Sequence, residues 1–474
     1  MQPYTLPSQS ADYLPVFRQL LPTNVLRTIV RTFVPRYYER ILTPMVLLWG
    51  FIYQELDGEG SCDDVLTHLE SGALDRWDQE TRSSGKACPP LSQRFSHNNS
   101  AYCQGRERLP LEVLSQTLRQ TATSIRDQMG ESGYWKGCRV LLLDGTTLLL
   151  QASEALIDHY GRHSNQHGAS HFPLLRAVAS FNLQSAAVEQ MEEGTLKDSE
   201  QELTRRMLER SEAITDAADH LTVYVADSNF GVYSVMAAIV GIGAHALVRL
   251  TPVRMQSLLK RLDQPALEAG EERRICWTPT AADQRNINDT LPPCVKGRLM
   301  YARLERNGFR PKDLFFFTTL DEVAFVMDDL VELYGKRWHV ELNLRYIKSE
   351  LKLHHLTSKK VDMVAKELTA GLIAYNLIRG FMAMAAQRAG VEPVRLSFKR
   401  CWRRLQMFGR TCPLQATPHQ IVKRIDKLLE AMGACQILKR KPRQQPRNVR
   451  GKPRAYPLLI GERNRSNEKE ESKS

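Results

Sequence analysis

The segment Tyr334-Gly-Lys-Arg337-Trp338-His-Val-Glu341-Leu-Asn-Leu-Arg345-Tyr-Ile-Lys348 contains one early glycine and no proline, and it is predicted to form a single helix. With about 3.6 residues per turn, residues three, four, seven, eleven and fourteen positions apart share a face. One carboxylate therefore lies among three cations and two aromatic rings, on a stripe formed by Tyr334, Arg337, Trp338, Glu341, Arg345 and Lys348. The adjoining face is apolar and can pack on a core; it consists of Val340, Leu344, Ile347 and Leu351.

Two interpretations fit this stripe. A carboxylate among cations suits an acid that holds a metal while its neighbours hold phosphates and a base. Alternatively, the face is simply solvated, and pairs such as Arg337/Glu341 and Glu341/Arg345 stabilise the helix by about 0.2–0.5 kcal/mol each. The remaining sequence has to distinguish them.

The composition is that of a globular protein with a polyanionic partner. The chain has 474 residues, 42% of them hydrophobic and 25% charged, which is enough for a sizeable core in roughly two to four domains. The net charge of +12 and the pI of about 9.2 favour nucleic acid or an acidic membrane surface as the partner. Composition does not choose between these two.

The sequence start carries no secretory pattern, since Met1-Gln-Pro-Tyr-Thr5 is neither basic nor apolar. The most apolar early run, residues 41–53, is too short to span a bilayer. We therefore expect no membrane partner and a cytoplasmic location. The nine cysteines include no C-x-x-C pair, which argues against a zinc ribbon or a disulfide scaffold, so we expect free thiols.

Residues 1–130 are predicted to form a helical domain. Apolar residues at helical spacing recur in residues 25–34, 41–56 and 110–129, and proline or glycine separates these runs. Such a region suits a small DNA-binding domain, and equally a helical cap or a dimerisation module.

From Gly137 onward, predicted strands and helices alternate. Residues 138–143 form an apolar strand that ends at Asp144, followed by a turn at Gly145 and a second strand. Residues 221–226 form another apolar strand, which ends at Asp227. Functional sites of open α/β sheets collect at the carboxyl ends of strands, so the two acids are candidates for one site.

The later part of the chain has three predicted regions. Residues 251–312 combine charged helical pieces, prolines and short strand-like runs, which predicts an inserted β-rich subdomain. Residues 356–437 are predicted to be helical, with a suggested role in dimerisation. Residues 438–474 are rich in cations and proline, and we predict a disordered basic tail that acts either as a nonspecific DNA arm or as a solubilising extension.

Two acids at strand ends and one on a later helix form the set that two-metal phosphoryl transfer requires. Two divalent ions about 3.5–4 Å apart clamp the attacking and leaving oxygens of an in-line displacement. Hard ions such as Mg²⁺ prefer carboxylate oxygens. In this scheme Asp144 bridges both ions, while Asp227 and Glu341 each hold one.

Three motifs together carry a family resemblance. Asp144-Gly-Thr-Thr, Ala226-Asp227 and the Y-x2-R-x3-E-x6-K spacing from Tyr334 to Lys348 resemble a DDE transposase of the insertion-sequence-four family, which includes the Tn-five and Tn-ten transposases. The resemblance covers about residues 137–355. It implies an α/β, ribonuclease-H-like catalytic core with a β-rich insertion, flanked by a helical N-terminal domain that binds transposon ends and a helical C-terminal region.

The resemblance implies cut-and-paste DNA transposition. Family members cut one strand at the element's end with a metal-bound water, form a hairpin through the freed 3′-hydroxyl, reopen it and join the end to target DNA. The implied partners are two Mg²⁺ ions, with Mn²⁺ as a substitute, the terminal inverted repeats, the target DNA and a second copy of the chain in a synaptic complex.

The resemblance also assigns roles to the helix. Tyr334, Arg337 and Lys348 would contact phosphates near the cut, and Trp338 would stack near a displaced base. Arg345 lies on the same stripe without a family role, and we expect it to contact phosphate as well.

One residue departs from the family pattern, and one further residue is a candidate for a family role. Family members often carry arginine after the second aspartate, where this chain has Ser228, and Arg176 is a candidate for the missing phosphate contact. A tryptophan in the insertion helps to hold the hairpin in relatives. Trp277 is the candidate here, with packing inside the insertion as the alternative.

Two rival interpretations remain. His159, His163, His167 and His171 recur every four residues and would form a zinc ladder on a helix, although nearby glycines favour a loop. For the whole chain, the alternatives to an active transposase are a related nuclease that cuts without joining, and a nonenzymatic DNA-binding protein derived from a transposase.

Overall fold

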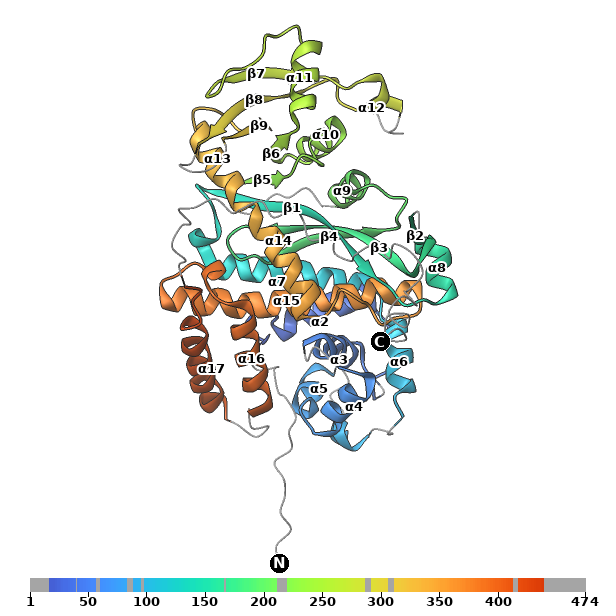
Figure 1. Ribbon diagram of the computed structural model, residues 1–474. Coiled ribbons are helices and arrows are strands. Elements are labelled where there is room, and N and C mark those ends of the chain that lie inside the picture. Colours follow the sequence, from blue (N-terminus) through green and yellow to red (C-terminus); the bar gives the residue numbers. More distant parts are fainter. Residues whose placement is uncertain are drawn as a thin grey trace, which may run out of the picture. The chain divides into compact units, whose positions relative to one another are not determined.

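The computed structural model describes residues 17–39, 41–56, 60–82, 88–94, 98–165, 168–210, 220–285, 291–305, 311–411 and 417–438. The described elements belong to a mixed α/β fold (Figure 1). Almost all of them lie in one compact unit, which consists of Met1–Ala302 and Leu314–Leu438. The end of strand β8 and the start of strand β9, within Arg303–Asp313, belong to a second small unit. The basic tail predicted from residue 438 onward lies outside the described residues, apart from Leu438 itself.

A nine-stranded sheet is the centre of the fold. Its strands are β1 (Cys138–Leu149), β2 (Arg162–Asn165), β3 (Gly168–Asn182), β4 (Val188–Gly194), β5 (Leu221–Ala226), β6 (His245–Leu250), β7 (Glu272–Trp277), β8 (Val295–Leu304) and β9 (Lys312–Thr318). The order is β2-β3-β1-β5-β6-β9-β8-β7, with β4 also paired to β3. Strands β1, β5 and β6 are mutually parallel, and the pairs β1/β3, β2/β3, β3/β4, β6/β9 and β7/β8 are antiparallel.

Strand β1 runs through the predicted turn. Antiparallel pairing with β3 continues from Leu141 to Leu149, across Asp144 and Gly145, so the predicted turn and second strand are wrong. The reason is the long partner strand, whose backbone groups keep β1 extended. Parallel pairing with β5 stops at Leu142, and β1 projects beyond its neighbour from there.

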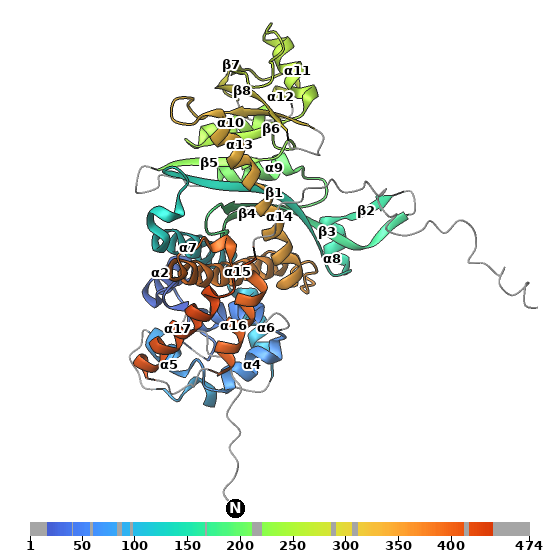
Figure 2. The ribbon, with the colours of Figure 1, turned by 60° about the vertical axis from the view of Figure 1, so that its left-hand side comes forward.

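Both faces of the sheet are covered, as the sequence of β1 requires. Val140 and Leu142 belong to one buried cluster and Leu141 and Leu143 to another, because successive side chains of a strand point to opposite faces. The second cluster includes the helices α9 (Glu200–Glu209), α10 (Tyr233–Gly241) and α11 (Pro252–Arg261). The first includes α7 (Leu111–Met129) and α15 (Val361–Ala389), which lie side by side (Figures 1 and 2).

The N-terminal part is helical, as predicted. It contains α2 (Thr23–Phe33), α3 (Pro44–Leu56), α4 (Cys62–Glu70), α5 (Asp75–Thr81), α6 (Ser100–Arg108) and α7, with short turns η1 (Leu91–Gln93) and η2 (Gly130–Gly133). The C-terminal part is also helical, with α15, η4 (Pro393–Arg395), α16 (Phe398–Thr411) and α17 (Pro418–Gly433). Helix α15 is long and apolar enough to cross a bilayer, but 94% of its most apolar window is buried within the fold, so it is placed as a core helix.

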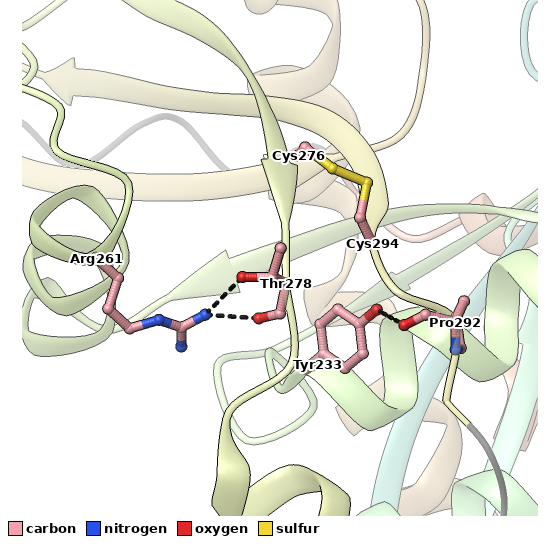
Figure 3. The surroundings of a disulfide bond; sticks show 6 residues. All are labelled: Tyr233, Arg261, Cys276, Thr278, Pro292 and Cys294. Carbon is pink, nitrogen blue, oxygen red and sulfur yellow. Dashed lines mark hydrogen bonds between the residues drawn. A yellow bond between two sulfur atoms is a disulfide. The ribbon is translucent and has the colours of Figure 1, made fainter.

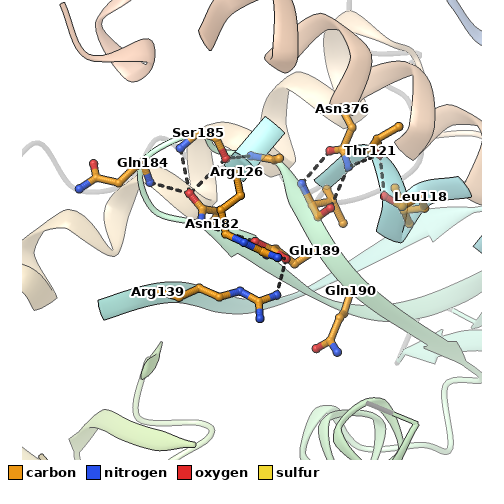
Figure 4. Close-up of polar contacts among 12 residues, drawn as sticks. Leu118, Thr121, Arg126, Arg139, Asn182, Gln184, Ser185, Glu189, Gln190 and Asn376 are labelled. Carbon is orange, nitrogen blue, oxygen red and sulfur yellow. Dashed lines mark hydrogen bonds and ion pairs between the residues drawn. The ribbon is translucent and has the colours of Figure 1, made fainter. Parts of the chain in front are cut away.

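A buried ionic cluster joins α7 to the sheet (Figure 4). The carboxylate of Glu189 in β4 lies 3.4 Å from Arg126 of α7 and 2.5 Å from Arg139 of β1. Burial alone would raise the pKa of Glu189, but the two guanidinium groups hold it below its usual range. Asn376 of α15 bonds both the N–H and the carbonyl of Val188, so α15 is fixed to the same strand.

The insertion extends the sheet, and it contains β7, β8 and the helices α11 and α12 (Ala281–Arg285). Its two strands form a hairpin that continues the sheet beyond β9, so the predicted β-rich insertion is paired into the central sheet. A disulfide joins Cys276 to Cys294 across this hairpin, which corrects the expectation of free thiols for these two residues (Figure 3). Trp277 is buried between the rings of Tyr233 and Phe317, as its packing alternative predicts.

The predicted helix from Tyr334 to Lys348 consists of three consecutive segments. Helix α13 (Met327–Lys336) ends before Arg337, α14 (Trp338–Arg345) follows, and the π-helical turn η3 (Tyr346–Glu350) completes the run. The prediction of one uninterrupted helix is therefore wrong in detail. The predicted apolar face is confirmed, since Val340, Leu344, Ile347 and Leu351 are all buried.

A buried arginine holds the point where α14 becomes the π turn. Arg379 of α15 donates from Nη2 to Asn343 Oδ1 at 2.7 Å and from Nε to the Tyr375 hydroxyl at 2.8 Å. Its guanidinium also lies over the rings of Tyr346, Tyr375 and Phe398. The catalytic-helix candidate is thus anchored to α15 by hydrogen bonds and cation–π contacts.

One more helix connects two strands. Helix α8 (Glu154–Tyr160) follows β1 and precedes β2. It is short, and its Leu156 and Tyr160 are buried.

Candidate active site

Asp144 and Asp227 lie just beyond the point where the parallel pairing of β1 with β5 ends. The register pairs Leu142 with Val225, and each aspartate stands two residues further along its own strand direction. Local hydrogen bonds orient both carboxylates: the Gly145 N–H donates to Asp144 Oδ1 at 2.9 Å, and the Asn229 N–H donates to Asp227 Oδ1 at 2.8 Å. Parallel pairing therefore brings these two acids to one end of the sheet.

Arg337 connects Glu341 to this end of the sheet. Its Nη2 donates to Glu341 Oε1 at 2.8 Å, and its Nη1 lies 3.5 Å from Asp144 Oδ2. The break between α13 and α14 at Arg337 places this side chain against β1. One guanidinium is thus shared by two of the three predicted acids.

Burial dominates the electrostatics of Asp144. It raises the pKa of this carboxyl to about 6; the Gly145 N–H and Arg337 act to lower it, while the charges of Asp227 and Glu200 raise it further. The charges of two neighbouring carboxylates thus add to the burial of Asp144 in raising its pKa. This is the electrostatic setting that a divalent cation would relieve.

The other predicted side chains divide into two groups. Lys348 Nζ donates to Thr146 Oγ1 at 2.9 Å, which places it beside the Asp144-Gly-Thr-Thr segment, and burial lowers its pKa. Burial raises the pKa of the Tyr334 hydroxyl, whose ring packs on Phe316 and lies near Arg337. These two residues belong to the site.

Trp338 and Arg345 lie on the outer side of α14. The side chain of Trp338 is 59% exposed, and Arg345 is exposed with its guanidinium over the Tyr346 ring. Because of this exposure, both side chains are available to a partner that approaches from solvent.

Four residues near the site were missed by the sequence reasoning. Glu200, at the start of α9, lies against Gly145, and its amide partner Asn229 follows Asp227 by two positions. Arg254 of α11 donates to the carbonyl of Ser228, and the charge of Arg249 of β6 acts to lower the pKa of Tyr334, which burial raises. No local sequence signal identifies them, because each reaches the site from a different element.

Arg176, the candidate for the missing phosphate contact, donates from Nη1 to the carbonyl of Asp198 at 2.5 Å, in the segment before α9. Arg254 donates to the carbonyl of Ser228 itself, so it is a second candidate for this cation.

The donor chemistry of the site fits hard divalent cations. Carboxylate oxygens suit Mg²⁺ and Mn²⁺, and the Arg337 guanidinium already places a positive group between Asp144 and Glu341. Within the described ranges, no three His, Cys, Asp or Glu side chains are close enough to form a preassembled metal site.

The histidine ladder is not formed. His159 lies on α8, His163 on β2 and His171 on β3, so these three do not share a helix. His167 lies outside the described residues. The helical zinc site considered from the spacing is therefore wrong for the three histidines that are described.

Comparisons with known proteins identify the family. Residues 135–377, just over half of the chain, match the model of the transposase DDE domain, and this stretch includes every site residue named above. The chain belongs to the DDE transposase family. It is therefore an enzyme that cleaves and transfers DNA strands.

Individual relatives agree with this assignment. The DDE transposase is 26% identical over 366 residues to the transposase InsG for insertion sequence element IS4 of Escherichia coli (strain K12), across 76% of this chain and 78% of that protein. The resemblance to the insertion-sequence-four family is thus confirmed. Among solved structures, it is similar to the piggyBac transposase synaptic complex with hairpin DNA, with 9% identity, a TM-score of 0.39, and coverage of 88% and 85% of the two chains. That score is too low to support an argument about this chain.

Proposed function

We propose that this DDE transposase moves an insertion sequence by cut-and-paste transposition, with Asp144, Asp227 and Glu341 as the catalytic acids. The observation that carries the proposal is the Arg337 contact, which joins Glu341 of α14 to Asp144 of β1. Acids from distant parts of the sequence are brought to one end of the sheet, where sites of open α/β folds collect. We assign the core to the ribonuclease-H-like class, supported by the order β4-β3-β1-β5-β6 and its parallel β1/β5/β6 part.

The three acids would hold two divalent ions, Mg²⁺ or Mn²⁺, which activate the attacking oxygen and stabilise the leaving oxygen when bound. Asp144, Asp227 and Glu341 would supply the carboxylate oxygens that hold these ions. Arg337, released from the carboxylates, would be free to contact the phosphate at the cut. Lys348, fixed by Thr146, would contact a neighbouring phosphate.

Two further DNA contacts are assigned to side chains that are exposed to solvent. Trp338 presents an exposed ring on which an unstacked base can stack, which suits a hairpin intermediate. Arg345, exposed on the same helix, would contact the backbone, and Tyr334 would contribute its hydroxyl near Arg337. The substrate is double-stranded DNA, in the form of terminal inverted repeats and then target DNA.

The assembly is also proposed. We assign residues 1–130 to transposon-end binding, residues 137–355 to catalysis and residues 356–437 to dimerisation, in a homodimeric synaptic complex that works in the cytoplasm at the nucleoid. The net charge of +12 supports a nucleic-acid partner.

The central experiment uses Glu341→Gln. The terminal sequences of the DNA that bounds the gene are incubated with the protein and Mg²⁺, and both nicking and binding are measured. We expect nicking to fall by at least about 10³-fold, because one metal-holding carboxylate is lost, while binding stays within about twofold. Full cleavage by the variant would refute the assignment of Glu341.

A strand-transfer assay separates the alternative functions. Joined products with a target plasmid are expected; cleavage without joining would favour a nuclease. Binding without cleavage in Mg²⁺ or Mn²⁺ would favour a nonenzymatic DNA-binding protein.

A further inference from the structure

Glu200 is the first residue of α9, and its carboxylate lies directly against the backbone beside Asp144. A Cβ built on Gly145 would come within 2.2 Å of Glu200 Oε1. Any side chain at position 145 would therefore push this carboxylate away. The Asp144-Gly pair thus leaves space for an acid from another element.

The position of Glu200 is fixed by the helix that carries it. The Ser199 side chain caps α9 by accepting from the Glu202 N–H at 3.1 Å. Leu203 and Met207 of the same helix are buried in the cluster that contains Leu141. The carboxylate is held at the end of β1 by a packed helix.

A second contact links Glu200 to the other strand end. Asn229 donates from Nδ2 to Glu200 Oε2, and its backbone N–H donates to Asp227 Oδ1 at 2.8 Å. Gln201 Nε2 fixes the Asn229 side chain by donating to its Oδ1 at 2.8 Å. Glu200 is therefore connected to both aspartates, to Asp144 through Gly145 and to Asp227 through Asn229.

Among the residues that the structure describes, no salt bridge to Glu200 explains this placement. The nearby arginines of its own helix serve other acids: Arg205 pairs with Glu202, and Arg206 pairs with Asp198. Among the described residues, Oε1 of Glu200 receives no hydrogen bond. Arg337 contacts Asp144 and Glu341, so the Glu200 oxygen remains open to a cation that binds at this end of the sheet.

We propose that Glu200 is a fourth carboxylate of the metal site, a ligand of the divalent ions assigned to Asp144, Asp227 and Glu341. This inference rests on the proposed function and adds a ligand from a helix that the three sequence motifs do not include. The hard oxygen of Glu200 matches the same ions. It also explains the glycine at position 145, whose missing side chain leaves room for Oε1.

Metal binding by the full-length protein tests the inference directly. Free Mn²⁺ is measured by electron paramagnetic resonance during titration of wild-type protein and Glu200→Gln. Glutamine keeps the shape and the hydrogen bond from Asn229 but removes the charge. We expect Mn²⁺ affinity to fall at least about tenfold. Glu209→Gln is the matched control, since Glu209 is exposed at the far end of α9, and it should bind Mn²⁺ as wild type does.

A double-mutant cycle gives an independent measurement. Gly145→Ala should weaken Mn²⁺ binding by displacing Glu200, and it should cost little further affinity in a Glu200→Ala background, where the space is free. Equal losses in both backgrounds would contradict the proposed contact.

Asp144→Asn separates the two levels of the argument. If Asp144→Asn weakens Mn²⁺ binding and Glu200→Gln does not, the inference about Glu200 is overturned while the proposed function stands. If neither variant changes Mn²⁺ binding, the metal site of the proposed function fails as well.

Discussion

Asp144→Asn is expected to stabilise the folded protein while it abolishes DNA cleavage. Burial raises the pKa of Asp144 from 3.8 to about 6, and Asp227 and Glu200 add to the effect. Because the pKa is higher in the folded state, the ionised carboxylate is less favourable there than in the unfolded chain. At neutral pH this costs about 3 kcal/mol of folding free energy, which asparagine would avoid.

The sign and the pH window follow from the same values. Above pH 6 the carboxylate is ionised in both states and the full cost is present. Between pH 6 and 3.8 the folded protein takes up a proton before the unfolded chain does, so the cost declines. Below pH 3.8 both states are protonated, and the advantage of asparagine disappears.

Thermal unfolding in EDTA provides the assay, because bound metal would stabilise the wild type selectively. For a chain of this length, about 3 kcal/mol corresponds to a rise in Tm of about 3 °C. The difference between variant and wild type should shrink as the buffer is lowered from pH 7.5 to pH 5. Cleavage in Mg²⁺ should be absent at every pH.

Glu189→Gln is the control with the opposite sign. Glu189 is buried like Asp144, but Arg126 and Arg139 hold its pKa low, so removal of its charge takes away a carboxylate that both buried guanidinium groups contact. We expect a loss of about 3–5 kcal/mol. If Asp144→Asn lowered the Tm at pH 7.5, or raised it equally at pH 5, the electrostatic account of the site would be refuted.

Three further outcomes are expected. Lys348→Ala should reduce cleavage at least about tenfold. It should also lower the salt dependence of DNA binding by about one phosphate contact, which titrations at several salt concentrations would detect. An unchanged slope of affinity against salt concentration would contradict a phosphate role. Trp338→Ala should leave the Tm unchanged, since the ring is 59% exposed, and should slow hairpin formation about tenfold in a gel assay; a large fall in Tm would indicate a packing role. Replacing Cys276 and Cys294 together by serine should lower the free energy of unfolding by about 3 kcal/mol, because the disulfide closes a loop of 18 residues. Cleavage should stay intact. Equal Tm values of wild type with and without reductant would show that the bond adds no stability.

The sequence by itself determined the features that depend on local order. Helical spacing placed Arg337, Glu341 and Lys348 on one stripe, and the apolar runs ending at Asp144 and Asp227 identified two strands with acids at their ends. The motif spacing identified the family, which the matched domain confirms. These features are readable because periods of 2 and 3.6 residues depend only on near neighbours along the chain.

The tertiary structure decided the features that depend on distant segments. Strand β3 carries β1 straight through the expected turn at Gly145, and Arg337 interrupts the expected helix where it reaches the sheet. The contact of Glu200 with Gly145 and the disulfide from Cys276 to Cys294 join residues whose separation in sequence gives no hint of contact. Such contacts are set by packing, since only the folded sheet and its covering helices bring the side chains within hydrogen-bonding or bonding distance.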